Sequence, residues 1–149
     1  MTKRKRAALA VALWLGLSAG AFAQVLIMNE PVGPLRAFGT ETAGIVLADP
    51  KGITLYTYDA DTAGKPTCSG ACAQTWPPFL VADPSLPHDS YDGVRRGNVG
   101  IIMREDGKKQ WTFNDKPLYY NAKDTNPGDA SGNKVGNVWN VVNLPGFFE

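Results

Sequence analysis

The sequence is poor in the side chains on which hydrolytic enzymes depend. It has one histidine among 149 residues, no Gly-x-Ser-x-Gly motif, and no pair of histidines that could bind zinc together with a carboxylate. These residues are too few to form a Ser-His-Asp triad or a zinc site of several histidines and a carboxylate. A glycine-rich phosphate-binding loop is absent as well. No group of residues therefore indicates an enzyme, and we expect a non-enzymatic role.

Long segments with the 3.6-residue period of an amphipathic helix are also missing, whereas glycine and proline recur throughout. In their place stand short runs rich in β-branched and aromatic residues, bounded by Asp, Pro and Gly, which is the pattern of β-hairpins. The runs are 44–47, 53–58, 99–103, 110–113 and 117–120. The first two flank the turn 49–52 and the next two flank the turn 105–108, so each pair predicts a hairpin. The fold class predicted is mostly β with little helix.

The segment 1–23 predicts a cleavable secretory signal. A positive block, Lys3 to Arg6, precedes an apolar run from Ala7 to Ala19, and Ala21-Phe22-Ala23 supplies small residues before Gln24. This order is typical of exported proteins, and no cysteine stands at the junction to accept a lipid. We expect a mature protein that begins at Gln24 and is periplasmic or secreted.

The mature chain is mildly acidic. The signal carries four of the 15 Lys and Arg residues and none of the 14 Asp and Glu residues, which leaves 11 positive against 14 negative side chains. This balance argues against nucleic acid as a partner, and no second apolar run has the length of a membrane span. The expected partner is an envelope protein or a small ligand.

The second half of the chain repeats the first at a constant offset. Leu55-Tyr56, Asp61-Thr62 and Trp76 fall on Leu118-Tyr119, Asp124-Thr125 and Trp139. Such a duplication predicts two degenerate, hairpin-containing repeats that pack on each other in a small single domain. The predicted organisation is a signal peptide at 1–23, an irregular leader at 24–40 and a domain at 41–149, with repeat one at about 43–82, a linker at 83–98 and repeat two at about 99–145.

The repeated residues form a recognisable motif. Tyr56, Tyr58 and Asp61 fit the pattern Tyr-x-aromatic-x-x-Asp; Cys68, Cys72 and Trp76-Pro77-Pro78 follow, and Tyr119, Asp124 and Trp139 form the second copy. Together they resemble the family called "secreted repeat of unknown function", also described as predicted lipoproteins, over roughly residues 43–143. The sequence departs from the family pattern in two ways. Asn121 stands where the second copy of the motif would have its aromatic residue, and the lipid-accepting cysteine is missing. The resemblance implies export and names no activity.

Cys68 and Cys72 leave three interpretations open. A disulfide needs Cα atoms about 4.4–6.8 Å apart, and one helical turn brings positions i and i+4 to roughly 6 Å. A structural staple of this loop length would contribute about 2 kcal/mol. The pair could instead be a redox or copper site, or two free thiols. Copper(I) would need further soft or imidazole ligands, and no motif places His88, Met28 or Met103 beside the pair. No cofactor is predicted, and copper is the metal that the pair would suit.

The acidic loops and the aromatic residues also have two interpretations each. The loops around Asp61 and Asp124 supply oxygen ligands near glycine, but neither fits the calcium-binding loop pattern, and Asp in such a place commonly closes a turn by accepting backbone N–H groups. The recurring Tyr and Trp residues could bind a ligand or build the repeat interface, and we expect the interface.

These patterns predict an exported cell-envelope protein of unknown molecular function, and specifically a non-enzymatic binding or accessory module. The alternative is an envelope redox, electron-transfer or copper-handling protein that uses the Cys-x-x-x-Cys pair. A structural or adhesive surface protein is the third possibility.

Overall fold

The computed structural model describes residues 31–32, 34–83, 91–94 and 97–144. The predicted signal peptide, residues 1–23, lies outside these ranges, as does the proposed start of the mature chain at Gln24. The elements in chain order are β1 (Pro31–Val32), β2 (Leu35–Thr40), β3 (Gly44–Ala48), β4 (Tyr56–Tyr58), α2 (Ala71–Thr75), β5 (Tyr91–Val94), β6 (Gly97–Met103), β7 (Lys109–Phe113), β8 (Lys116–Pro117), the 3-10 helix η1 (Val135–Asn137) and β9 (Trp139–Val141).

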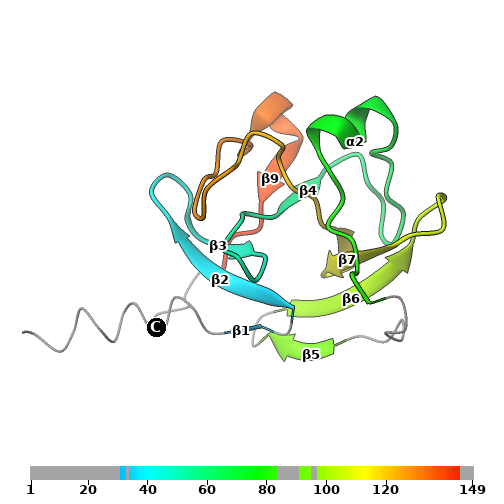
Figure 1. Ribbon diagram of the computed structural model, residues 1–149, viewed down its shortest axis with the longest axis horizontal. Helices are drawn as coiled ribbons and strands as arrows, with labels where there is room; N and C mark the ends of the chain where they lie inside the picture. The colour runs from blue at the N-terminus through cyan, green and yellow to red at the C-terminus, as the bar shows by residue number, and fades with distance from the viewer. Residues whose placement is uncertain (1–30, 33, 84–90, 95–96, 145–149) are drawn as a thin grey trace, which may run out of the picture.

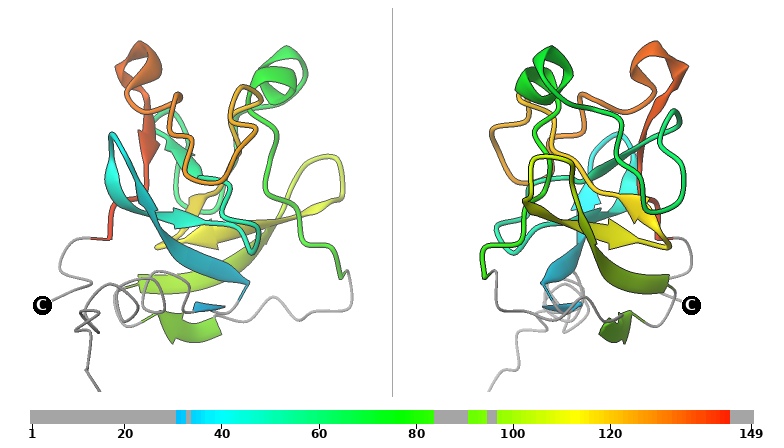
Figure 2. Two further views of the ribbon diagram at one scale, coloured as in Figure 1. Left: turned by 60° about the vertical axis from the view of Figure 1, so that its left-hand side comes forward. Right: turned by 90° about the vertical axis from the view of Figure 1, so that its right-hand side faces the viewer.

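The strands form three antiparallel sheets, which confirms the mostly β prediction. Their orders are β1-β2-β3, β4-β9 and β5-β6-β7-β8. In Figure 1 the long strands β2 and β6 lie below β4 and β9, with α2 at the upper end. Figure 2 shows α2 and the turn that contains η1 at the same end of the molecule, one on either side.

Residues 35–40 form a strand, so the prediction of an irregular leader up to residue 40 is wrong there. β2 pairs with β3 from Arg36↔Ala48 to Thr40↔Gly44, and Leu35 and Ala37 are fully buried. Pro34 precedes the strand and Gly39 stands near its end, where neither breaks the ladder. These two turn-forming residues obscured a strand that alternates between the core and the surface.

The first predicted hairpin forms only over a short stretch, and the second is confirmed. Segment 44–47 pairs mainly with β2. Around the turn 49–52 the chain is closed by the bridge Ala48↔Thr54 and by two hydrogen bonds, from the Leu55 amide to the Leu47 carbonyl and from the Asp49 amide to the Ile53 carbonyl. The turn explains this, because Oδ1 of Asp49 accepts the amides of both Lys51 and Ile53 and bends the chain tightly. β4 then pairs with β9 instead. β6 and β7 form the expected hairpin around 105–108.

The two halves of the chain are related by an internal twofold. The amides of Tyr56 and Tyr119 donate to each other's carbonyl oxygens, at 2.8 and 2.9 Å. The Asp59 amide bonds the Val138 carbonyl at 2.8 Å, and at the equivalent positions of the other copy the Ala122 amide bonds the Thr75 carbonyl at 2.9 Å. Reciprocal contacts of this kind are the mark of a twofold relation.

The relation extends to the long hairpins, where the offset grows by one position. The Leu47 amide bonds the Val142 carbonyl, and the Trp111 amide bonds the Phe79 carbonyl. The segment from Leu47 to Leu55 in the first copy corresponds to the segment from Trp111 to Leu118 in the second. The first of these segments is longer by one residue. The β2–β3 hairpin therefore matches β6–β7, and repeat one begins before the predicted residue 43.

Two clusters of buried side chains fill the interior. One is mainly aliphatic and lies between the long hairpins: Leu35, Ala37, Leu47, Leu55, Phe79, Val99, Ile101, Trp111, Phe113, Leu118 and Leu144. The other, which we call the aromatic core, consists of Val46, Tyr56, Cys68, Trp76, Tyr119, Trp139 and Val141. Both clusters draw on both halves of the chain, so the domain has no core that belongs to one repeat alone.

Candidate functional site

The tyrosines and aspartates of the motif exchange hydrogen bonds between the two repeats. Tyr56 Oη donates to Oδ2 of Asp124, and Tyr119 Oη donates to Oδ2 of Asp61 over 2.8 Å. Both tyrosines are fully buried. Each phenol therefore obtains its acceptor from the opposite repeat, and the exchange joins the two halves.

Each of these carboxylates also closes the loop that follows it. Oδ1 of Asp61 accepts the amide and the hydroxyl of Thr67, and Oδ1 of Asp124 accepts the same two groups of Ser131. Both oxygens of each carboxylate are thus bonded to protein donors, which explains the acidic residues as loop-closing groups. Within the described ranges, no cluster of three or more His, Cys, Asp and Glu side chains comes together.

The aromatic rings stack where the repeats meet. The rings of Trp76 and Trp139 are 3.9 Å apart and inclined by 5°, and Tyr58 stacks on Trp139 at 4.2 Å and 11°. Tyr56 meets Trp76 edge-on, and Tyr119 meets Trp139 in the same way. Asn121 holds the position that Tyr58 has in the first copy and is buried, so the three-ring stack is built on one side only.

Burial and carboxylate partners raise the pKa of three tyrosines. For Tyr56 and Tyr119, burial has the largest effect on the pKa, followed by the hydrogen bonds to Asp124 and Asp61. Arg104 partly offsets the rise in the pKa of Tyr119. Burial and the charge of Asp49 raise the pKa of Tyr120, whose hydroxyl donates to that carboxylate over 3.0 Å. All three phenols are therefore held in the neutral form.

Cys68 and Cys72 form a disulfide, with Cα atoms 5.3 Å apart. Cys72 lies in α2 and is partly exposed, whereas Cys68 is buried in the aromatic core. The Cys72 amide donates to the Ser69 carbonyl at 3.1 Å, and in repeat two the Val135 amide makes the same bond to the Gly132 carbonyl at 3.2 Å. The fold thus closes this loop without sulfur in the second copy, and the disulfide is an addition to it.

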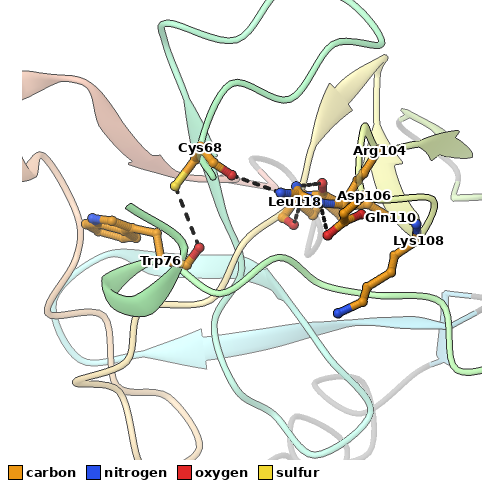
Figure 3. Close-up of polar contacts among 7 residues, drawn as sticks. All are labelled: Cys68, Trp76, Arg104, Asp106, Lys108, Gln110 and Leu118. Atoms are coloured by element: carbon orange, nitrogen blue, oxygen red, sulfur yellow. Dashed lines mark hydrogen bonds and ion pairs between the residues drawn. The ribbon is translucent and has the colours of Figure 1, made fainter. Parts of the chain in front are cut away.

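A buried arginine clamps the disulfide loop to repeat two (Figure 3). Nη2 of Arg104 donates to the Cys68 carbonyl over 3.0 Å, and Nη1 donates to Oε1 of Gln110 over 2.5 Å. Gln110 is fully buried and donates in turn to the Leu118 carbonyl over 2.7 Å. The remaining donor, Nε, is buried, has no hydrogen-bond acceptor among the described residues, and lies 3.7 Å from Oδ2 of Asp106.

The clamp and the disulfide exist on one side of the twofold only. In repeat one, Thr40 stands at the position of Arg104 and Val46 at the position of Gln110. The Thr40 hydroxyl donates to the Gly44 carbonyl within its own turn, and Val46 is buried in the aromatic core. The loop that matches the disulfide loop carries Ser131 and Val135. The two copies have therefore diverged around the disulfide, while the Tyr, Asp and Trp framework has remained.

The divergence borders an open cleft of about 910 Å³. We call it the disulfide-side cleft. It lies between loop 62–69 of repeat one and hairpin tip 103–106 of repeat two, and its charged residues are Lys65, Arg104, Glu105 and Asp106. A second cleft of about 700 Å³ lies at the twofold-related place, between hairpin tip 39–42 and loop 123–131. In contrast to the first cleft, it has no arginine among its described lining residues.

Arg104 and Gln110 are the residues that sequence reasoning missed. Each is a polar residue beside apolar strand residues, and neither belongs to a known motif. An alignment of the two copies could have identified them if it had included a gap of one residue. Such an alignment places Arg104 opposite Thr40 and Gln110 opposite Val46. At the single offset that relates the Tyr, Asp and Trp residues, Arg104 falls on Glu41 and Gln110 on Leu47, which are not their structural counterparts.

Comparison with known proteins agrees with the internal repeat. Residues 38–79 and 100–143 each match a family described as a secreted repeat of unknown function. The two matched segments correspond to the two halves that the hydrogen bonds relate by a twofold. No curated protein and no solved structure matches the chain. Across the described residues, no helix is both long and apolar enough to cross a membrane.

Proposed function

Because this chain belongs to the family of secreted repeats of unknown function, which places it in the periplasm or outside the cell, we propose that it is a non-enzymatic binding or accessory module of the envelope. We further propose that residues 1–23 are its signal peptide, removed after Ala23. The motif residues Tyr56, Tyr58, Asp61, Trp76, Tyr119, Asp124 and Trp139 serve as the framework in this proposal. The binding surface is the disulfide-side cleft.

The divergence between the two copies carries this proposal. Residues that both copies share serve the common fold, so a role gained by one copy is expected where the copies differ. Here the disulfide, Arg104 and Gln110 all differ from their counterparts. Arg104 lines one of two related clefts and is hydrogen-bonded to both Gln110 and the Cys68 carbonyl behind it.

The chemistry of Arg104 indicates a ligand with a carboxylate or phosphate group. The side chain of Arg104 is 6% exposed, and its Nε has only the distant Asp106 carboxylate at 3.7 Å, beyond hydrogen-bond range. A ligand anion that displaced Asp106 would gain a charge-assisted hydrogen bond. Asp106 is half exposed and can turn toward water, and Lys65 supplies a second cation to the same cleft.

An NMR titration of the ¹⁵N-labelled protein with sodium acetate and with sodium phosphate tests this site. We expect chemical shifts to change in residues 62–69 and 103–106, and to change less at 39–42 and 124–131. Arg104→Lys should weaken binding about tenfold or more, because a hydrogen bond to a charged group contributes about 1.5–3 kcal/mol. The probe with the larger response identifies the anion.

Sodium chloride at equal ionic strength is the control for salt effects, and Lys123→Ala, in the other cleft, is the matched control for Lys65→Ala. Lys65→Ala should weaken binding and Lys123→Ala should not. Equal responses in both clefts, or shifts that sodium chloride reproduces, would contradict the proposed site.

The alternative role is thiol–disulfide exchange or copper handling. The observation that favours it is the unequal exposure of the pair: Cys72 can be reached from solvent while Cys68 is buried next to the Arg104 clamp. A buried cation near a cysteine stabilises the thiolate and so favours the reduced form. Copper(I) would draw on the same two sulfur atoms.

Redox titration against glutathione and dithiothreitol buffers separates the two roles. For a structural staple we expect a reduction potential below about −300 mV, and Cys68→Ser should lower the free energy of unfolding by about 2 kcal/mol or less with the fold intact. For an active pair the potential should lie near about −200 mV, or the reduced protein should bind one equivalent of copper(I). We expect the first result, and the second would replace the binding module by a redox protein.

A further inference from the structure

Neither repeat completes its own sheets. Residues 142–144 of repeat two pair with the edge of β3 in repeat one, through the Leu47–Val142 and Ile45–Leu144 hydrogen bonds. Residues 79–81 of repeat one pair with the edge of β7 in repeat two in the same way, and β4 pairs with β9. Each repeat therefore presents open strand edges that only the other repeat fills.

The buried polar groups impose the same requirement. Without repeat two, the Tyr56 hydroxyl would lose its acceptor, and Asp61 would lose the hydrogen bond from Tyr119. An unpaired buried polar group is costly, so a single repeat has to find a partner repeat. Because the contacts are reciprocal, the surface that one repeat offers fits the other as in a twofold dimer.

We infer that two copies of this chain exchange repeats, so that each lobe of a dimer combines repeat one of one copy with repeat two of the other. None of the contacts between repeats depends on their belonging to the same chain, and the segment between Val81 and Gly97 is the one covalent connection. In the exchanged dimer the disulfide-side cleft is composite: Arg104 of one copy binds the Cys68 carbonyl of the other. The partner is thus a second copy of this chain.

The connection also sets the conditions for exchange. Because the two repeats are joined covalently, pairing within one chain corresponds to an effective concentration on the order of 1 mM. We expect monomers after refolding from dilute solution, and dimers after refolding at a protein concentration of about 1 mM or higher.

The stacked tryptophans provide a direct test. Trp76→Phe and Trp139→Phe each retain an aromatic ring but remove the Trp–Trp pair, and with it the exciton couplet in the circular dichroism spectrum. When the two variants are refolded together at high concentration, a mixed dimer has one lobe with both tryptophans. The couplet should return at up to about a quarter of the wild-type amplitude, since half of the dimers are mixed and one of their two lobes is restored.

Refolding Trp139→Phe together with Trp139→Ala is the matched control, because no pairing of these chains restores the stack. A second measurement uses Thr57→Cys with Asn140→Cys, a pair in register between β4 and β9. The new disulfide should stay within one chain after dilute refolding and should link two chains after concentrated refolding. Absence of the couplet, together with single-chain products at every concentration, would overturn the inference.

Discussion

Trp139→Ala should lower the free energy of unfolding by about 3–5 kcal/mol, the usual result of removing a large aromatic side chain from a core. Trp139 is 5% exposed and contacts Trp76 and Tyr58 by stacking and Tyr119 edge-on. Removing the indole would leave a cavity at the centre of the repeat interface, so both halves lose support at once. Urea denaturation followed by circular dichroism measures the change.

The internal twofold supplies the controls for this substitution. Trp76→Ala should have a similar effect, because Trp76 is 6% exposed, stacks on the same partner and meets Tyr56 edge-on. Trp139→Phe, which keeps a ring in the stack, should cost clearly less than Trp139→Ala. Separate unfolding of the two repeats in either alanine variant would show that the interface does not hold the domain together.

Alkaline pH should destabilise the protein steeply above pH 10. The pKa values of Tyr56, Tyr119 and Tyr120 are raised in the folded state, above the value of about 10 of an unfolded chain. Their contribution to stability is complete below pH 10 and is lost as the pH rises toward the folded-state values, because the unfolded phenols then ionise while the folded ones cannot. At pH 11 the loss should be about 1 kcal/mol per tyrosine, so the three together should lower the free energy of unfolding by roughly 3–4 kcal/mol.

Urea midpoints at pH 9, 10, 10.5 and 11 measure this dependence, and absorbance at 295 nm follows the phenolate directly. Tyr120→Phe is the control, since it should reduce the proton-linked slope by one third without disturbing the Tyr–Asp exchange between the repeats. Ionisation of all tyrosines near pH 10 in the folded protein would contradict the prediction.

The sequence predicted the local features of the fold and missed those that depend on distant partners. The alternation of Ile, Val, Trp and Phe identified the β6–β7 hairpin, because that hairpin forms between neighbours in the chain. Nothing local shows that β4 leaves its own hairpin to pair with β9, which lies in the other repeat. The two Tyr–Asp hydrogen bonds, which form only when the repeats meet, accompany that pairing.

The candidate site was predicted in part for a similar reason. The pair Cys68 and Cys72 stood out by spacing, and helical geometry permitted the bond that the structure contains. Arg104, directly after β6, and Gln110, in β7, did not stand out, because polar residues are mostly exposed to water. Their burial follows from the position of the Cys68 carbonyl in the opposite repeat, which no window of neighbouring residues reveals.

The dependence of each repeat on the other also affects when the chain can fold. Repeat one lacks its partner segments at 139–144 until repeat two is also available, so we expect no stable half to form from repeat one alone. Contacts over such sequence distances make folding slow. For an exported protein this delay is useful, because a polypeptide that is threaded through a membrane must stay unfolded until its last segment has passed. We therefore expect the duplicated architecture to help such a chain stay unfolded during its passage.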